Sequence, residues 1–372
     1  ERLIMSCIIC SEEKGQVYRE EFQQFQTVTS DCRPFGAGGE LLLCSFCDTV
    51  YRPRTNQWRA NCRKIYSSYV AHRQGRGDEQ KLFESSSSIS RSAKLVDQLL
   101  RIEFLSDNLT WLDFGCGEGH FLRELENASK NCRLYGCDFG QTPPDRFQPS
   151  TRKKYFPIDS RPRLRFDRVS LIHVAEHFFN PVQELKEIKK MLKPNAKLFI
   201  QIPYLKENPL DLIIADHGTF FTKETIQSLL LRSGYKIEQI SADWVRKELS
   251  IVVSIADKFS TSPQSSCEGV GGKECSLSIL KTHYRYLSDL KDEIARKKDG
   301  EGLIIFGSSI GATWGAAESG FENVEAFFDE DSARWGFDHL GIPILSPKRN
   351  IQNVVIPLDA GTREKIKNKY NF

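Results

Sequence analysis

Apolar residues follow two different rhythms along the middle of the chain. Short apolar runs, as long as a buried strand, alternate with longer stretches in which apolar residues recur every three or four positions, as in an amphipathic helix. The pattern predicts helices at 89–105, 119–128 and 181–193 and strands at 110–114, 132–137, 166–172 and 197–202. Strands that alternate with helices favour an α/β fold with a doubly wound parallel sheet.

A second, shorter unit of the same kind follows. An amphipathic helix is predicted at 277–297, and then a strand, a loop and a helix in "GLIIFGSSIGATWGAAESG". Residues 259–276, between the two units, are rich in Ser and Gly, which is typical of a linker or a surface loop. We therefore expect a central domain at 76–258 and a C-terminal Rossmann-like α/β domain at 277–372.

Residues 1–75 follow neither rhythm. Their apolar runs are short, so this domain would bury little surface and needs another source of stability. Cys7 and Cys10 form one C-x-x-C pair, and Cys44 and Cys47 form another. Two such pairs supply four thiolates to one tetrahedral Zn²⁺ with no open position. The sequence therefore predicts a zinc-binding domain with a structural site.

Composition and charge restrict the partners. Eleven cysteines are an odd number for a disulfide framework, which favours metal binding, with Cys32 and Cys62 as alternative ligands. A net charge of +3, with basic and acidic residues interspersed, offers no field for a polyanion, so we expect no nucleic acid. No apolar stretch approaches the about 18 residues of a membrane span. We expect a cytoplasmic protein without membrane association.

The stretch "WLDFGCGEGHF", residues 111–121, joins the first strand of the central domain to its helix. Gly115, Gly117 and Gly119 alternate there, so backbone N–H groups at the start of the helix can approach a ligand closely. A dinucleotide-binding fingerprint needs its third glycine at position 120, where this chain has His120. The loop therefore does not predict NAD binding.

The D-x-G-x-G-x-G pattern resembles motif I of the class I S-adenosylmethionine-dependent methyltransferases. The next strand ends in Asp138, where a short carboxylate can accept hydrogen bonds from both ribose hydroxyls of an adenosine. The resemblance implies a Rossmann-like methyltransferase domain with Asp159 beside the adenine. The residues that it implies for S-adenosylmethionine are Asp113, Phe114, Gly115, Cys116, Gly117, Gly119, Asp138, Phe139, Asp159 and His173.

The resemblance extends to both ends of the chain. The order of a zinc domain, a methyltransferase domain and a C-terminal Rossmann-like domain is similar to that of nucleotide-sugar C-methyltransferases, which act on 4-keto-deoxy sugars. A C-terminal motif of that family corresponds to Asp329, Arg334, Gly336, Gly341, Pro343 and Ile344. The family uses this domain beside the acceptor's nucleotide, so the N–H groups of 307–311 and Arg334 are expected to meet a pyrophosphate. The alternative is a domain that only covers one side of the cleft.

Methylation of a carbon beside a ketone requires a base for the proton and a donor for the enolate oxygen. Asp216 and His217 follow the fifth strand, where the acceptor pocket opens. The family has Tyr-x-Glu-His there, so the resemblance implies His217 as the base, helped by Asp216, with Ile214 in place of the tyrosine. Glu176 and His177, at the end of the fourth strand, are further candidates for acid–base work or for the cofactor shell.

The family also has an aromatic Y-x-S-S motif ahead of the methyltransferase domain. Its counterpart here is either Phe83-Glu84-Ser85-Ser86 or "YSSY" at 66–69. The spacing alone leaves both alignments open.

These features predict an S-adenosylmethionine-dependent methyltransferase with a structural Zn²⁺ and a small-molecule acceptor. By the resemblance, the acceptor is a nucleotide-linked keto-deoxy sugar that is methylated on carbon. An O- or N-methyltransferase of another small molecule or glycan precursor is the first alternative, because deprotonation is easier there. A cofactor-binding interaction protein without turnover is the second. We expect a monomer.

Overall fold

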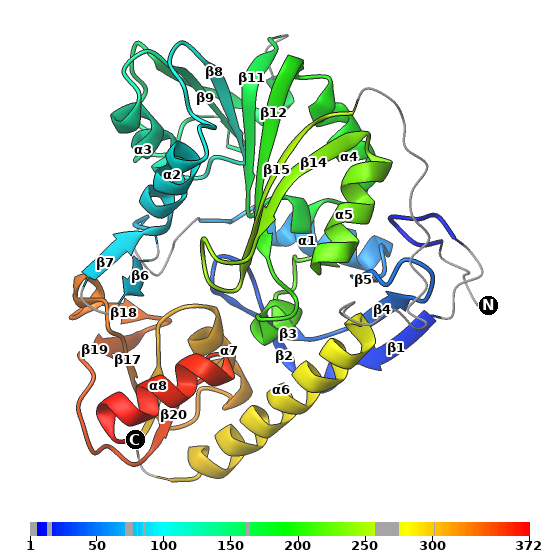
Figure 1. Cartoon of the computed structure of the whole chain (residues 1–372). Helices are drawn as coiled ribbons and strands as arrows, with labels where there is room; N and C mark the ends of the chain where they lie inside the picture. The colour runs from blue at the N-terminus through cyan, green and yellow to red at the C-terminus, as the bar shows by residue number, and fades with distance from the viewer. Residues whose placement is uncertain are drawn as a thin grey trace.

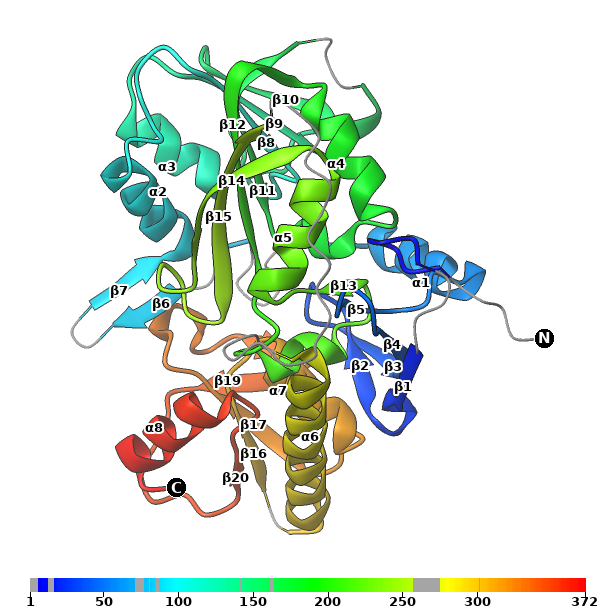
Figure 2. The same ribbon diagram turned by 45° about the vertical axis from the view of Figure 1, so that its right-hand side comes forward.

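The three parts of the molecule meet at one end of a central sheet (Figure 1). The computed structural model describes residues 6–12, 17–70, 77–79, 81–84, 87–140, 142–160, 164–256, 275–300 and 302–372. The N-terminal and C-terminal parts lie next to each other at this end, and the long helix α6 (Ser276–Lys298) runs along both, as a second view also shows (Figure 2). The end of the central sheet is therefore covered by both other parts.

The central sheet has seven strands in the order β10-β9-β8-β11-β12-β15-β14. Neighbours from β10 to β12 are parallel, and β15 alone runs against its neighbours. The strands are β8 (Thr110–Phe114), β9 (Arg133–Asp138), β10 (Lys153–Pro157), β11 (Phe166–Ile172), β12 (Leu192–Pro203), β14 (Tyr235–Ser241) and β15 (Glu248–Ile255). The predicted α/β fold with a doubly wound, Rossmann-like sheet is confirmed.

Helices cover both faces of this sheet (Figure 1). They are α2 (Arg91–Arg101) and α3 (His120–Ala128) on one face, and α4 (Pro181–Lys189) and α5 (Lys223–Arg232) on the other. Side chains of β12 alternate between the two cores: Phe199 packs with the α2–α3 side, and Leu198 and Ile200 pack with the α4–α5 side. Two apolar cores therefore hold the sheet in place.

Two predicted helices are shorter than expected. The helix predicted at 181–193 ends at Lys189, and β12 begins at Leu192. Pro194 accounts for this, because proline lacks an N–H group and favours an extended residue before it. The helix predicted at 89–105 is α2, which begins after the capping residue Ser90. Most of the predicted linker at 259–276, namely residues 259–274, lies outside the described residues.

The N-terminal part contains small sheets and one helix. Its four-stranded sheet has the order β1-β4-β5-β13 and takes its last strand from the central part of the chain. The elements are β1 (Val17–Glu21), the 3₁₀ helix η1 (Phe22–Gln24), β2 (Gln26–Val28), β3 (Pro34–Ala37), β4 (Glu40–Cys44), β5 (Val50–Tyr51), α1 (Asn56–Tyr66), β13 (Thr219–Phe220) and a hairpin of β6 (Lys81–Glu84) with β7 (Ser87–Ser90). The boundary between these two parts is therefore crossed by a strand.

The C-terminal part is a second α/β unit. Its five-stranded sheet has the order β18-β19-β17-β16-β20. Besides α6, its elements are β16 (Leu303–Phe306), α7 (Ile310–Glu318), β17 (Val324–Phe328), the 3₁₀ helix η6 (Ser332–Arg334), β18 (Asp338–His339), β19 (Ile342–Leu345), β20 (Val354–Val355) and α8 (Ala360–Tyr370). The predicted strand, loop and helix at its start are present.

One segment, residues 204–222, joins all three parts. It contains the 3₁₀ helix η5 (Pro209–Ile213) and strand β13. Leu210 belongs to an apolar core that also holds Phe25 of the N-terminal part and Trp314 of the C-terminal part. The N-terminal and C-terminal parts thus share a core across this segment.

None of the helices in the described ranges has the length and apolar character needed to cross a membrane.

Candidate active site

A cavity of about 1500 Å³ opens where the three parts meet. It is lined by residues of α1, of the glycine loop, of the ends of β11 and β12, and of the C-terminal part. Among them are Tyr66, Tyr69, Gly115, Gly117, Asp138, Asp159, His173, His177, Ile214, His217, Ser309, Gly311 and Lys365. Many residues that the sequence singles out therefore face one space.

The glycine loop has the backbone that its sequence predicts. Gly115, Gly117 and Gly119 have φ values of 77°, 46° and 76°, a region that favours glycine. A Cβ atom on Gly115 would lie 2.5 Å from Val174 Cγ2, and one on Gly119 would lie 2.8 Å from the ring of Phe147. The loop is thus a cradle that side chains would fill, and this fits the approach of a cofactor to the backbone.

Asp138 holds this loop and faces the cavity. Its carboxylate accepts hydrogen bonds from the backbone N–H groups of Gly117 and Phe139, both at 2.7 Å. Burial raises the pKa of this carboxyl above its usual value. Phe139 is 61% exposed, and its ring stacks on Tyr66 with centroids 5.3 Å apart. An exposed aromatic ring beside a strand-end carboxylate fits a nucleoside.

Asp113 acts from inside the sheet. It is 2% exposed, and its Oδ1 accepts a hydrogen bond of 2.6 Å from Ser170 Oγ on the neighbouring strand β11. Burial raises the pKa of Asp113 to about 7. Its contacts therefore support the strand that carries the glycine loop. Phe114 and Cys116, also expected near the cofactor, line the same cavity.

His173 lies directly after β11 in a strained backbone conformation, with φ 54°. Its Nδ1 lies 3.2 Å from Glu176 Oε1, and its Nε2 lies 3.3 Å from Glu248 Oε2. Burial opposes protonation of the ring, but the charge of Glu248, followed by Glu176, raises the pKa of His173 to about 9. The residue expected in the cofactor shell is therefore a cation between two carboxylates.

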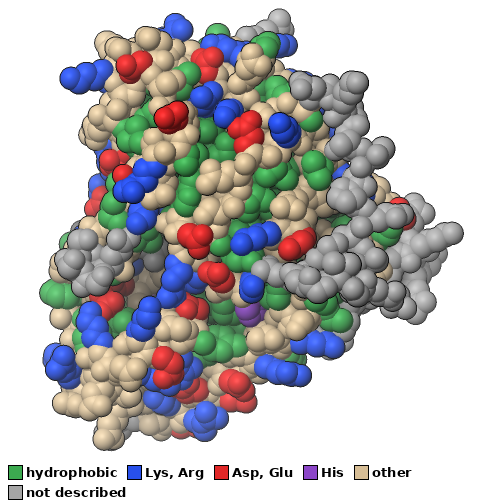
Figure 3. All heavy atoms as spheres, in the orientation of Figure 1, with side chains coloured by type: hydrophobic (Ala, Val, Ile, Leu, Met, Phe, Trp, Pro, Cys, Tyr) green, Lys and Arg blue, Asp and Glu red, His purple; other side chains and the backbone are tan. Residues whose placement is uncertain are grey.

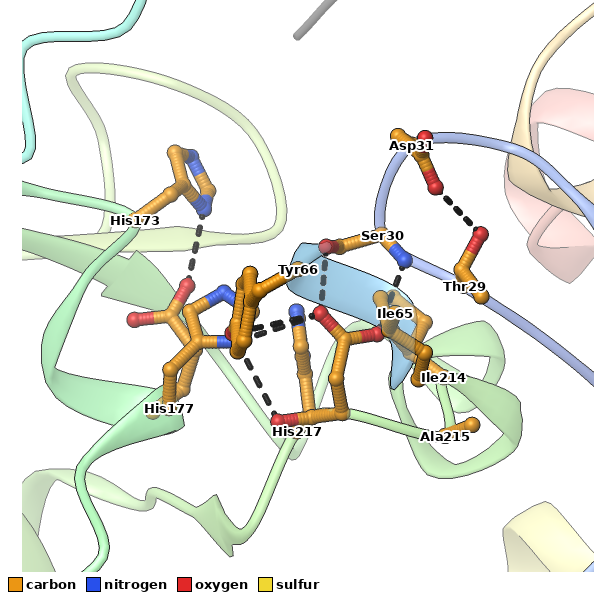
Figure 4. Close-up of polar contacts among 12 residues, drawn as sticks. Thr29, Ser30, Asp31, Ile65, Tyr66, His173, His177, Ile214, Ala215 and His217 are labelled. Carbon is orange, nitrogen blue, oxygen red and sulfur yellow. Dashed lines mark hydrogen bonds and ion pairs between the residues drawn. The ribbon is translucent and has the colours of Figure 1, made fainter. Parts of the chain in front are cut away.

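His177 and His217 form a pair at the centre of the site (Figure 4). Their rings are 4.6 Å apart at 87°. The Nδ1 of His217 lies 2.5 Å from Asp211 Oδ1, whereas Nδ1 of His177 lies 2.8 Å from the hydroxyl of Tyr66. Two imidazoles with different partners thus meet in one place.

The carboxylate that contacts His217 is Asp211, whereas Asp216, which was expected to help this base, contacts other groups. Asp216 is fully buried and accepts hydrogen bonds from Ser30 N at 2.9 Å and from Ser30 Oγ at 2.6 Å. Its Oδ2 also lies 3.4 Å from Nδ1 of His177. Adjacent residues in this turn point in different directions, so Asp216 serves His177 and the N-terminal part instead.

The two imidazoles have pKa values displaced in opposite directions. Burial, followed by the charge of His217, lowers the pKa of His177. Burial also acts to lower the pKa of His217, but the charge of the Asp211 carboxylate outweighs burial and raises this pKa. Divergent pKa values in neighbouring groups are typical of an acid and base pair.

Glu176 lies behind this pair. It is fully buried, its Oε1 faces His173, and its Oε2 has no hydrogen-bond partner among the described residues. Burial acts to raise the pKa of Glu176, but the hydrogen bond and the charge of His173 outweigh it and lower this pKa. Glu176 is therefore charged. Its carboxylate and the rings of His177 and His217 offer ligand atoms within 4.8 Å of one another. Because it does not line the cavity, Glu176 acts on the pair through its charge.

Tyr66 is a site residue that motif spacing left open. It ends α1 of the N-terminal part, and its hydroxyl contacts His177 and lies 3.4 Å from Asp216 Oδ2. Phe83, the other candidate counterpart of the family's aromatic residue, is 52% exposed at the cavity wall, and Ser85 and Ser86 lie outside the described residues. "YSSY" is the stretch that reaches the histidines.

Arg334 does not reach the cavity as expected. It is 6% exposed, donates to Ser308 Oγ at 2.7 Å, and pairs with Asp329 and Asp331 inside the C-terminal part. The start of α7, by contrast, lines the cavity with Ser309, Ile310 and Gly311. The site expected for a pyrophosphate therefore lacks the Arg334 side chain but still has the backbone at the start of α7.

The four paired cysteines lie together as predicted. Cys7 Sγ is 3.5 Å from Cys47 Sγ, and Cys10 Sγ is 3.6 Å from Cys44 Sγ. All four are buried, with their sulfurs within 4.8 Å of one another. Tetrahedral Zn²⁺ with Zn–S bonds of about 2.3 Å separates its sulfurs by roughly 3.8 Å, so the donor set and spacing fit zinc.

The outer surface shows no single-sign region on the face in Figure 3. Lys and Arg side chains are interspersed with Asp and Glu over that face. The mixture agrees with the net charge of +3.

Comparison with known proteins gives one family match, and it lies within the central part. Residues 89–240 match the model of a family described as a methyltransferase domain. Curated protein sequences give no match to the chain.

Solved structures with a similar fold include three methyltransferases. An N1-methyltransferase of 1,6-didemethyltoxoflavin from Burkholderia thailandensis has 15% identity, covers 56% of this chain and 96% of its own, and has a TM-score of 0.41. An S-adenosylmethionine-dependent methyltransferase from Mesorhizobium loti has 16% identity, coverage of 42% and 95%, and a TM-score of 0.36. A riboflavin-derivative dimethyltransferase from Streptomyces davawensis has 21% identity, coverage of 43% and 55%, and a TM-score of 0.35. Likenesses this distant do not indicate the acceptor.

Proposed function

Because the central part is an S-adenosylmethionine-dependent methyltransferase domain, we propose that the protein methylates a carbon of a nucleotide-linked keto-deoxy sugar. S-adenosylmethionine supplies the electrophilic methyl group when bound, held by the glycine loop, Asp138 and Asp159. One observation carries the proposal: two histidines with oppositely displaced pKa values lie in the cavity between that loop and the C-terminal part. Methylation on carbon needs both a base and a hydrogen-bond donor, because a proton on carbon is hard to remove.

His217 is the proposed base. Asp211 holds Nδ1 of the ring and fixes the tautomer, which leaves Nε2 to take the proton from carbon. The same carboxylate raises the pKa of His217 and so strengthens it as a base. This arrangement keeps the role expected for His217 but assigns the orienting carboxylate to Asp211.

His177 is the proposed donor to the enolate oxygen. In this role the hydroxyl of Tyr66, 2.8 Å from Nδ1, donates to that nitrogen and not to Asp216. The proton of the neutral ring then lies on Nε2, from which it can be donated. The lowered pKa keeps His177 neutral at pH 7. Ser30, from the N-terminal part, donates to Asp216 and so holds this carboxylate beside His177.

The C-terminal part is proposed to bind the acceptor's nucleotide. Ser309, Ile310 and Gly311 place the start of α7 at the cavity, where backbone N–H groups suit a phosphate. Lys365 of α8 lines the same region and adds positive charge, whereas the nearby Lys369 is paired with Glu330. These groups replace the expected contribution of Arg334.

A second candidate function is O- or N-methylation of another small molecule. Ile214 is buried at the cavity wall, where the resembled family has a tyrosine, and Leu210 lies beside it in the same wall. Because this apolar wall has no tyrosine hydroxyl to donate a hydrogen bond, it suits an acceptor that needs no donor at this position.

The test is a panel of nucleotide-linked 4-keto-deoxy sugars incubated with S-adenosylmethionine that carries a carbon-13 methyl group. We expect S-adenosylhomocysteine to form and the labelled methyl signal to appear at the shift of a C-methyl group. An O-methyl or N-methyl shift would support the second candidate instead. Turnover by none of the sugars, with slow cofactor loss only, would favour a cofactor-binding protein without turnover.

We also propose that Cys7, Cys10, Cys44 and Cys47 hold one structural Zn²⁺. Their burial leaves no open position for a substrate, so the ion would stabilise the N-terminal part without taking part in methyl transfer.

A further inference from the structure

The two ends of the cofactor are expected over different strands. Asp138 is the last residue of β9 and Asp159 follows β10, and both line the cavity on one side of β8. With the adenosine held there, the amino-acid end of the cofactor is directed toward β11 and β15, on the other side of β8. That end carries the cofactor's only carboxylate.

An ionic cluster lines the cavity on this second side. Glu248 Oε1 lies 3.0 Å from Arg91 Nη2, and Glu248 Oε2 lies 3.3 Å from Nε2 of His173 and accepts 2.7 Å from Gln201 Nε2. Nδ1 of His173 faces Glu176. Both oxygens of Glu248 therefore face cations or donors, and both ring nitrogens of His173 lie within 3.3 Å of a carboxylate oxygen.

Arg91 differs from the other members of this cluster. A guanidinium carries five N–H donors, so Arg91 can bind Glu248 and a second carboxylate at the same time. The side chain of Arg91 is 19% exposed and lines the cavity.

The fold brings this cluster next to the glycine loop. Val174, which follows His173, is so close to Gly115 that a Cβ atom there would lie 2.5 Å away. Arg91 is the first residue of α2, which lies beside α3 (Figure 1). Glu248 is the first residue of β15 and pairs with Pro203, the last residue of β12, because β15 runs antiparallel. The reversed strand thus delivers a carboxylate to the edge where the parallel strands end.

We propose that Arg91 binds the carboxylate of the cofactor's methionine part and that Glu248 is a positioning residue for this guanidinium. The inference rests on the cofactor of the proposed function and is independent of its acceptor. The proposal gives the amino-acid end of the cofactor a charged side-chain partner, in addition to the backbone of the glycine loop.

Titration calorimetry with two ligands tests the assignment. S-adenosylhomocysteine and 5′-methylthioadenosine share the adenosine, but only the first has the amino-acid part. We expect Arg91→Gln to weaken binding of S-adenosylhomocysteine by about 10- to 100-fold and to leave that of 5′-methylthioadenosine within about twofold of the parent value. Retained binding of the second ligand shows that the variant folds.

Two further variants sharpen the result. Arg101→Gln, on the same helix and 68% exposed, should change neither affinity. Glu248→Gln should weaken S-adenosylhomocysteine selectively, and it should lower the pKa of His173 as followed by NMR. An equal loss of both ligands in Arg91→Gln, or no loss of either, would overturn the proposal. A failed acceptor panel would not affect these titrations.

Discussion

His217 and Asp211 make a prediction about pH. The base must be neutral before it accepts a proton, so kcat/KM should rise with pH through the pKa of His217, which lies above the usual about 6.5 of histidine. Asp211→Asn removes the carboxylate whose charge, against the effect of burial, raises this pKa. We expect its acidic limb to move to lower pH and kcat to fall by about 10²- to 10⁴-fold, measured as a pH profile with the best acceptor.

The exposed Asp289 of α6 supplies a control for that variant. Asp289→Asn should leave both the profile and kcat unchanged. A profile of Asp211→Asn that coincides with the parent profile would remove Asp211 from the proposed mechanism. Exchange of the acceptor's α-proton in heavy water, without cofactor, would report the base separately from methyl transfer.

Asp113 makes a prediction about stability. Its pKa rises from 3.8 to about 7 on folding, so between these values the folded state binds the proton more tightly than the unfolded chain. The free energy of unfolding should therefore fall as pH rises across this window, by on the order of 4 kcal/mol for this group. Denaturant titrations from pH 4 to pH 7 should show a flatter dependence in Asp113→Asn. An unchanged slope would contradict the role of burial.

The residues of the site were predictable where one backbone segment holds them. Gly115, Gly117 and Asp138 lie at the ends of strands that the apolar pattern identifies, His177 and His217 lie in the segments that follow two such strands, and all five line the cavity. Tyr66 and Ser30 come from a different part of the chain, so no local spacing could indicate that they contact His177 and Asp216. The error over Asp216 has a similar cause, because sequence adjacency does not give side-chain direction in a turn.

At the scale of elements, the loop between β8 and α3 tolerates little change. We expect Gly115→Ala to lower stability by about 1–3 kcal/mol, because φ 77° and contact with Val174 both oppose a methyl group, and to weaken S-adenosylhomocysteine. Gly361→Ala in α8 is the control, since its added atom would meet nothing closer than 3.6 Å. Thermal melts and titrations of the two variants, compared with the parent, give the answer. Equal melting temperatures and equal affinities in the two variants would contradict the claim that Gly115 has no room for a side chain.

The strands of the central sheet were predictable for the same reason that they are stable. Leu198, Phe199 and Ile200 are buried between two layers of helices, which produces an apolar run. β13 was not predictable, because it has two residues and its pairing with β5 joins distant parts of the chain. The direction of β15 depends on the connection before it, which the apolar pattern does not record.

At the scale of the whole molecule, zinc should matter beyond its own domain. We expect one Zn²⁺ per chain by elemental analysis, and its loss in Cys44→Ser together with a lower and broader thermal transition. The reason is that these cysteines pack into the same core as β12 and α5. Cys62→Ser, outside the cluster, should keep the metal. Retention of zinc in Cys44→Ser would place the site elsewhere.

The segment 204–222 also has a consequence for making hybrid enzymes. Arg52 donates to the carbonyl of Leu212 and Trp58 to that of Ala215, while Leu210 packs against Gly311 of α7. If the N-terminal or the C-terminal part alone were replaced by that of a related enzyme, residues 204–222 with His217 would lose some of these contacts. Chimaeras that transplant the N-terminal and C-terminal parts together with this stretch, as a single cassette, should retain turnover where exchanges of one part lose it.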